Sequence, residues 1–249
     1  MHSADVPSDD LDPLPEDWTT ALAVVAHPDD MEYGASSAVA RWTSSGKQVI
    51  YLLATRGEAG IDATNPKEAK KIRTREQIAS CAAVGVRRLE FLDHPDGLIN
   101  DVLRLRKEIT GAIRRFRPDV VITTNHRETW GGRTLNLADH RVLGTAVLDA
   151  VRDASNRWIF ADLRTADRKP LEKWAGVRFT AVANSPTPTH AVDISETIDA
   201  GIASLLCHTS YLAELGAGSA NPDQFLRGSA ERTAARFGGR LAVGFEVFE

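Results

Sequence analysis

The sequence predicts an α/β protein whose mostly parallel sheet carries helices on both faces. Short apolar runs alternate with longer amphipathic segments from residue 21 onward, and this β-α-β-α order is typical of parallel strands joined by crossover helices. Two of the helical segments end at a glycine, Gly46 and Gly85, which readily adopts the left-handed conformation found after a helix. The 249 residues are enough for one such domain, with or without a small appendage.

The first elements follow from local patterns. Leu22–Ala26 is expected to be a buried strand because it is a short, continuous apolar run. Ala35–Ser45 is expected to form a helix that stops at the first glycine, and Gln48–Ala54 a second strand around an apolar centre. Pro66–Val84 is predicted to be a charged amphipathic helix closed by the second glycine.

The alternation then repeats. Leu89–Leu92 is the third expected strand. Ile99–Phe116 is predicted to be a helix because its apolar residues recur at helical spacing. Val120–Thr123, preceded by a proline, is the fourth strand, and Ala138–Ala154 is the helix that follows it.

Beyond residue 157 the pattern weakens, so residues 157–249 are expected to be a C-terminal extension of a single domain that spans residues 19–249. Residues 1–18 are rich in acidic side chains and prolines, and we expect an acidic surface arm there. The elements expected in the extension are strands at Phe179–Ala183 and His190–Asp193, a helix at Ser195–Leu215 and a final strand at Arg240–Phe248.

The composition is that of an ordinary globular protein, with 43% hydrophobic and 26% charged residues. A net charge of −4 does not favour nucleic acid or an anionic membrane as a partner, and no apolar run has the length of a membrane span. Cys81 and Cys207 both lie in helical patterns, so no disulfide is expected. No signal-peptide pattern begins the chain, and a cytoplasmic protein that acts on a small molecule is expected, with its oligomeric state left open.

The most informative segment follows the first expected strand, where His27, Asp29 and Asp30 lie on one short loop. Asp139 and His140 follow the loop after the fourth strand. In a doubly wound sheet these two strands flank the point where the strand order reverses, and ligands bind in the crevice at their carboxyl ends. Two loops that are distant in sequence therefore bring groups of the kind that bind metals to one place.

These residue types suit a catalytic zinc site. His27, Asp30 and His140 would supply three ligands and leave a fourth position open for water. Asp29 would accept a proton from that water, and Asp139 would orient a neighbouring imidazole. The alternative is structural: His27 would cap the strand, and the two aspartates would cap the next helix.

Other candidates also have structural alternatives. His94-Pro95-Asp96 echoes the first motif after the third strand, and Asp96 either contacts a polar substrate or forms a turn with the following glycine. Arg73 would ordinarily be a solvated cation on a charged helix. The sequence has no G-x-S-x-G elbow and no G-x-G-x-x-G after the first strand, so it favours neither a serine hydrolase nor a dinucleotide site.

The run His27–Glu32, followed by Gly34, resembles the H-P-D-D-x-E motif of the LmbE-like (PIG-L) family of zinc-dependent de-N-acetylases. The resemblance extends from about Leu22 to Ala150. The supporting segments are Thr55–Gly60, Arg73 with Glu76, Ala79–Val86, Asp96-Gly97 and Asp139-His140, with weaker agreement at His208 and Glu246–Phe248.

This resemblance implies a Rossmann-like, three-layer α/β/α fold and hydrolysis of an acetamide, commonly on an amino sugar. It also implies that Asp29 is the general base and that Arg73 and Asp96 face the substrate. The residues that the resemblance assigns to zinc are His27, Asp30 and His140.

The sequence departs from the family motif at one position. Aligning Asp139-His140 with the end of the family's H-P-D-H motif places Leu137 where the first histidine belongs. That histidine stabilises the oxyanion or protonates the leaving amine in the family, and a leucine does neither. His126 emerges directly after the fourth strand and is the first substitute, although an ordinary loop histidine is an equal alternative. The remaining candidates are Arg127, His190 and His208.

We therefore expect a zinc-dependent amidohydrolase that removes an acetyl or other small acyl group from an amide nitrogen of a small polar molecule, such as an amino sugar or a natural product. One competing hypothesis is a catalytically impaired protein that still binds metal or ligand, because of Leu137. Another is a metal-free domain that binds a sugar or nucleotide. Substrate specificity is expected in Thr55–Lys67, Thr124–Asn136 and the C-terminal extension.

Overall fold

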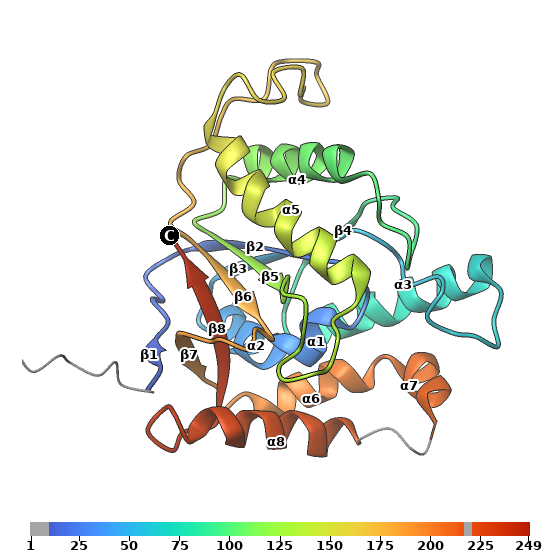
Figure 1. Cartoon of the computed structure of the whole chain (residues 1–249), viewed down its shortest axis with the longest axis vertical. Coiled ribbons are helices and arrows are strands. Elements are labelled where there is room, and N and C mark those ends of the chain that lie inside the picture. The colour runs from blue at the N-terminus through green and yellow to red at the C-terminus, as the bar shows by residue number, and fades with distance from the viewer. Residues whose placement is uncertain (1–9, 217–220) are drawn as a thin grey trace, which may run out of the picture.

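The computed structural model describes residues 10–216 and 221–249, which form a three-layer α/β/α fold (Figure 1). Its eight-stranded sheet has the order β1-β7-β8-β6-β5-β2-β3-β4. The strands are β1 (Asp12–Pro13), β2 (Thr20–Val25), β3 (Gln48–Leu53), β4 (Arg88–Phe91), β5 (Val120–Thr124), β6 (Phe179–Ala183), β7 (His190–Asp193) and β8 (Ala242–Phe248). The helices are α1 (Asp30–Gly34), α2 (Ser36–Ser44), α3 (Pro66–Ala83), α4 (Val102–Phe116), α5 (Ala138–Ser155), α6 (Ile198–Leu206), α7 (Thr209–Leu215) and α8 (Pro222–Ala234).

The sheet is mostly parallel, as predicted. β2 pairs in parallel with β3 on one side and with β5 on the other, so Ala23 lies between Tyr51 and Ile122. The chain order therefore reverses at β2 and β5, and the crevice at their carboxyl ends is where such folds bind ligands. β8 is the exception, because it runs antiparallel to both β6 and β7.

Side chains alternate between two hydrophobic cores along the central strand. Leu22 and Val24 of β2 pack in the core beneath α4 and α5, whereas Ala23 and Val25 belong to the core on the opposite face, beneath α2 and α6. This period of two is the geometry of a strand buried on both faces. It fixes the end of β2 firmly, and the loop that begins at residue 26 starts from a rigid base.

The C-terminal extension differs from the expected pattern. The predicted helix at residues 195–215 is two helices, α6 and α7, separated at Cys207-His208. α8 was not predicted, although Asn221 and Pro222 form a typical helix start in which the asparagine side chain accepts a hydrogen bond from the Asp223 amide.

The described part of the predicted acidic arm packs against the domain; residues 1–9 of that arm lie outside the described residues. Leu11, Leu14 and Trp18 are buried, and β1 pairs with β7. The Trp18 ring meets Trp42 edge-on at 5.2 Å between centroids, and the ammonium of Lys47 lies 4.8 Å from the Trp18 centroid. These apolar side chains, spaced among the acids, hold residues 11–18 against the domain.

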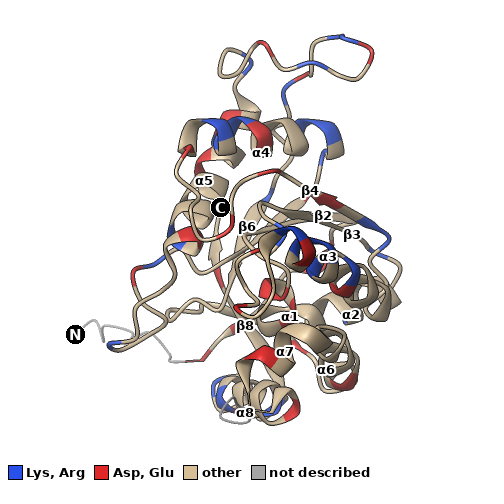
Figure 2. Cartoon of the chain, turned by 90° about the vertical axis from the view of Figure 1, so that its right-hand side faces the viewer, with Lys and Arg blue, Asp and Glu red and all other residues tan. Residues whose placement is uncertain are grey.

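The surface carries charges of both signs. Lysine and arginine are interspersed with aspartate and glutamate along α3, α4 and α8 (Figure 2). Among the described residues, no helix combines the length and the apolar character needed to cross a bilayer.

We expect Trp18→Ala to lower the free energy of unfolding by about 3–5 kcal/mol, because it empties a buried site. Trp158→Ala is the matched control, since Trp158 is 80% exposed and Trp18 only 3%. The control should change stability by no more than about 0.5 kcal/mol. Urea titration of both variants measures this, and equal losses would show that residues 11–18 do not contribute to the core.

Candidate metal centre and active site

A cavity of about 880 Å³ opens at the carboxyl ends of the central strands. It is bordered by the loops that follow β2, β3, β4, β5 and β6 and by residues of α7 and α8. This volume lies near the upper end of the range for small-molecule sites. The candidate metal ligands lie in this cavity, at the point where the strand order reverses.

Three ligand atoms converge on one point beside the cavity. His27 Nδ1 lies 3.2 Å from His140 Nε2, His140 Nε2 lies 3.0 Å from Asp30 Oδ1, and His27 Nδ1 lies 3.8 Å from Asp30 Oδ1. Ligands bound tetrahedrally to zinc at 2.0–2.2 Å are about 3.3 Å apart. The separations of these three atoms therefore fit a zinc ion, and the structure brings together the three residues that the sequence predicts as ligands.

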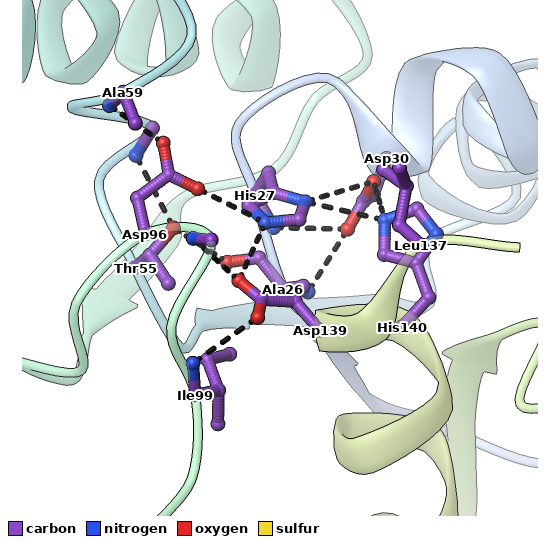
Figure 3. A network of polar contacts seen from close by, with 12 residues as sticks. Ala26, His27, Asp30, Thr55, Ala59, Asp96, Ile99, Leu137, Asp139 and His140 are labelled. Atoms are coloured by element: carbon purple, nitrogen blue, oxygen red, sulfur yellow. Dashed lines mark hydrogen bonds and ion pairs between the residues drawn. The ribbon is translucent and has the colours of Figure 1, made fainter.

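The other polar atoms of Asp30 and His27 are held by the protein (Figure 3). Asp30 Oδ2 accepts hydrogen bonds from the backbone amides of Ala26 and His27, each at 2.9 Å. His27 Nε2 lies 3.1 Å from both Asp139 Oδ2 and Asp96 Oδ1, so a proton on Nε2 leaves Nδ1 free to bind a metal.

The second imidazole is oriented by an amide that the sequence analysis missed. Asn136 Oδ1 lies 3.2 Å from His140 Nδ1, which directs Nε2 toward the other ligands. Asn136 Nδ2 donates to the carbonyls of Asn125 and Arg127, at 2.7 and 2.9 Å, and this fixes which way the amide faces. Asn136 lies one helical turn before His140 in sequence, and this spacing was the signal that could have identified it as a partner of the His140 ring.

The electrostatics favour a cation. Burial by itself favours a neutral His27, but hydrogen bonds to Asp139, Asp30 and Asp96 raise the pKa of this imidazole well above its ordinary value. Burial disfavours the charged form of Asp30, yet His140 and His27 hold the pKa of that carboxyl well below its ordinary value. A site with this many carboxylates stabilises positive charge.

A second group of potential ligands shares one histidine with the first. Among the described residues, His27, Asp96 and Asp139 also have ligand atoms within 4.8 Å of one another. Asp139 accepts hydrogen bonds from the amides of Gly97 and Ile99, at 2.8 and 3.1 Å. These bonds hold Asp139 as a partner of the His27 ring, which matches its predicted orienting role.

Asp29 lies beside the candidate metal site without joining either group of ligands. Its backbone is left-handed, with φ 97° and ψ −20°, which is uncommon for a residue other than glycine. Burial raises the pKa of Asp29 to about 6, and the neighbouring Arg73 opposes that rise. A buried carboxylate next to a metal site is suited to proton transfer.

Arg73 and Asp96 border the cavity, as the sequence analysis expected, but their polar atoms are mostly engaged within the protein. Arg73 is 1% exposed, donates to the Pro28 carbonyl, lies 3.2 Å from Asp29 Oδ2 and stacks 3.9 Å above the Tyr211 ring. These contacts therefore favour a role for Arg73 in holding Asp29 over a role in contacting substrate hydroxyls.

Two glycines make room for this guanidinium. A Cβ at Gly60 would lie 2.5 Å from Arg73 Nη1, and one at Gly57 would lie 3.2 Å from Arg73 Cζ.

The carboxylate of Asp96, like the guanidinium of Arg73, is engaged within the protein, because its second oxygen accepts a 2.8 Å hydrogen bond from the Ala59 amide.

His126 does not border the cavity, and this corrects the sequence prediction of a proton donor there. The ring contacts Phe248 at 5.8 Å between centroids, and its backbone packs closely against Gly144 of α5. Burial lowers the pKa of His126, which disfavours a protonated imidazole. Position alone could not show that the ring of residue 126 lies against Phe248 of β8 instead of facing the metal site.

The fallback donors are also placed elsewhere. Arg127 pairs with Glu246, His190 lies on β7 beside Thr189, and His208 is fully buried. Leu137 does border the cavity and is 54% exposed.

Apolar and aromatic side chains form much of the outer wall. Trp130 meets His140 edge-on at 5.3 Å, and Tyr33 meets Phe225 in the same way at 5.4 Å. Together with Leu137, these side chains give the cavity an apolar wall suited to the apolar faces of a ring. Most of these wall residues come from the loop after β5 and from the C-terminal extension, two of the regions expected to set specificity.

The model of the family described as PIG-L, GlcNAc-PI de-N-acetylase, matches residues 22–151. The chain belongs to this family. The match covers the loops that carry His27, Asp30 and His140, and it confirms the resemblance noted in the sequence.

Individual relatives agree with the family. The chain is 27% identical over 203 residues to diacetylchitobiose deacetylase of Thermococcus kodakarensis, covering 80% of this chain and 72% of that one. N,N'-diacetylchitobiose deacetylase from Pyrococcus horikoshii has a similar fold, with a TM-score of 0.81 at 22% identity over 94% of this chain and 85% of that chain. The zinc inhibited form of teicoplanin deacetylase Orf2 matches with a TM-score of 0.63 at 16% identity, over 92% and 98% of the two chains. These three relatives are all named as deacetylases.

We predict that Asn136→Leu lowers zinc affinity by about 10–100-fold, because His140 loses the acceptor that orients its ring. Competition with a chromogenic chelator measures the affinity. Asn156→Ala is the control, since the Asn156 side chain accepts from the Trp158 amide on the far side of α5. Equal affinities in the wild type and in Asn136→Leu would contradict the role given to this amide.

Proposed function

We propose that this protein is a zinc-dependent N-deacetylase that removes an acetyl or small acyl group from the amide nitrogen of an amino sugar or a related small polar molecule. The observation that carries the proposal is the convergence of His27 Nδ1, Asp30 Oδ1 and His140 Nε2 beside Asp29, in a chain of the PIG-L family. Two free thiols, Cys81 and Cys207, support a reducing, cytoplasmic setting as part of the proposal.

His27, Asp30 and His140 would hold the metal, and three protein ligands leave a coordination position open toward the cavity. A bound zinc ion supplies a Lewis acid that polarises an acetamide carbonyl and lowers the pKa of water toward neutrality. The candidate site lies next to the cavity, so an acetamide can enter from the solvent side.

Asp29 performs the proton transfer in this proposal. Its carboxylate accepts a proton from the attacking water as the new carbon–oxygen bond forms. The same carboxyl group then gives the proton to the nitrogen as the carbon–nitrogen bond breaks, which releases acetate and a free amine. Because one carboxyl group acts first as base and then as acid, the proton transfer does not need the family histidine that Leu137 replaces.

Tyr211 supplies a hydroxyl group to the described cavity lining near Asp29. Its ring lies against the guanidinium of Arg73, which pairs with Asp29. The sequence analysis missed it because α7 was expected to be the end of a longer helix. The impaired-enzyme alternative rested on Leu137 and gains no support from the relatives, which are deacetylases.

The substrate in this proposal is larger than one acetamido sugar. The cavity of about 880 Å³ has room beyond one sugar ring, and Trp130, Leu137 and Phe225 line its wall. The relatives named for diacetylchitobiose suggest a β-linked disaccharide of acetamido sugars as the first compound to test.

We expect the zinc-loaded protein to release acetate from diacetylchitobiose faster than from N-acetylglucosamine, because the second ring packs against the wall formed by Trp130, Leu137 and Phe225. A coupled acetate assay with both compounds tests this, with zinc added in stoichiometric amounts and in excess. No acetate from any acetamide in a broad panel, at full metal occupancy, would reject the proposal.

Asp29→Asn should keep zinc and lose turnover, because only the proton acceptor is removed. We expect kcat to fall by about 10²–10⁴-fold. His27→Ala is the contrast, since it should lose the metal. Metal analysis of both purified variants, beside their kcat values, separates the two roles, and loss of zinc in Asp29→Asn would make Asp29 a ligand.

A further inference from the structure

A polar cluster lies buried next to the cavity and takes no part in the proposed chemistry. Its members are at most 1% exposed, and isolated polar groups at such positions are costly. The cluster consists of Glu32, Gln77, Ser80, Ser204 and His208.

Gln77 connects this cluster to Asp29. Its Oε1 accepts a 3.2 Å hydrogen bond from the Asp29 backbone amide, and its Nε2 donates a 2.9 Å hydrogen bond to Glu32 Oε1. A carboxylate is only an acceptor, so Glu32 draws the NH₂ end of the Gln77 amide toward itself. The oxygen end is thereby turned toward the Asp29 amide, and the opposite orientation would set two donors against each other.

Glu32 is itself held on several sides. Ser80 Oγ donates to Glu32 Oε1, and Ser80 Oγ lies 2.7 Å from Ser204 Oγ on α6. His208 Nε2 lies 3.7 Å from Glu32 Oε2. The break between α6 and α7 falls at this histidine, so this part of the chain places Ser204 against Ser80 and His208 against the carboxylate of Glu32.

The polar face of α3 organises these contacts. Arg73, Gln77 and Ser80 are separated by four and three residues, so they lie along one side of the helix. Arg73 holds the carboxylate of Asp29, and Gln77 holds its backbone amide. An uncommon left-handed residue persists only where its surroundings determine it, and these two contacts do so at φ 97°.

We infer that Gln77 and Glu32 are positioning residues that hold the backbone of Asp29, and with it the proton-accepting carboxylate, in the geometry that catalysis requires. The catalytic part of this inference rests on the proposed function. The structural part does not, because it concerns the conformation of Asp29 alone.

Gln77→Met tests the inference in the zinc-loaded protein, since it keeps the side-chain length and removes both hydrogen bonds. We expect kcat to fall by about 100-fold, because small misplacements of reacting groups cause losses of this size. KM and zinc content should stay unchanged. A crystal structure of this variant should show Asp29 outside the left-handed region. Thr110→Val is the matched control, because Thr110 is a fully buried polar residue of α4, on the other face of the sheet.

Exchanging the two side chains distinguishes the proposed positioning role from a simple folding defect. Gln77→Glu alone sets two carboxylates side by side and should impair turnover. Adding Glu32→Gln restores one acceptor for the Asp29 amide and one donor between the pair, and it should recover at least half of the lost activity on a logarithmic scale.

The outcomes separate this inference from the proposed function. If the wild type hydrolyses no acetamide, the proposed function fails, and the Asp29 conformation in Gln77→Met still decides the structural claim. If Asp29 keeps φ near 97° and kcat is unchanged in Gln77→Met, the inference is overturned. An equal fall of kcat in Thr110→Val, or no recovery in the exchanged pair, also overturns it.

Discussion

The candidate site depends on the clamp that Asp30 makes on the turn after β2. One carboxylate oxygen accepts from the amides of Ala26 and His27, which bends the chain sharply as soon as the strand ends. That bend leaves Asp30 Oδ1 and His27 Nδ1 facing the same point, with the left-handed Asp29 beside them. β2 lies inside the sheet, between β3 and β5, so this turn starts from a strand that is paired on both sides and almost entirely buried.

The site is built at a cost in stability. Burial removes hydration from Asp29, and Arg73 only partly opposes the resulting rise in the pKa of that carboxyl. Imidazoles and backbone amides hold the pKa of Asp30 and of Asp139 below its ordinary value, so the ionised forms of these two carboxylates depend on the charged and polar groups around them. Apolar side chains of similar size would pack there more cheaply. In the proposed function a bound cation would offset part of this cost, so metal binding would also contribute to the free energy of folding.

Much of the fold, and the convergence of the candidate ligands, could be predicted from local sequence. The first strand reads as a buried run, and His27, Asp29 and Asp30 follow it directly, so their meeting with His140 required only the topology of a parallel sheet. Gln77 could not be predicted, because an amide on a charged helix resembles a solvated residue until its tertiary partners are known, and Asn136 was marked only by its spacing from His140. His126 failed for the same reason, since residue spacing in a loop does not give the direction of a side chain.

The most direct test of this account is the position of the metal. Anomalous diffraction at the zinc edge, from crystals of the zinc-loaded protein, locates the ion without reference to activity. We predict one zinc ion bonded to His27 Nδ1, Asp30 Oδ1 and His140 Nε2 at about 2.0–2.2 Å, with Asp29 unbonded. An ion between His27 Nε2, Asp96 and Asp139, or a bond from Asp29, would contradict it.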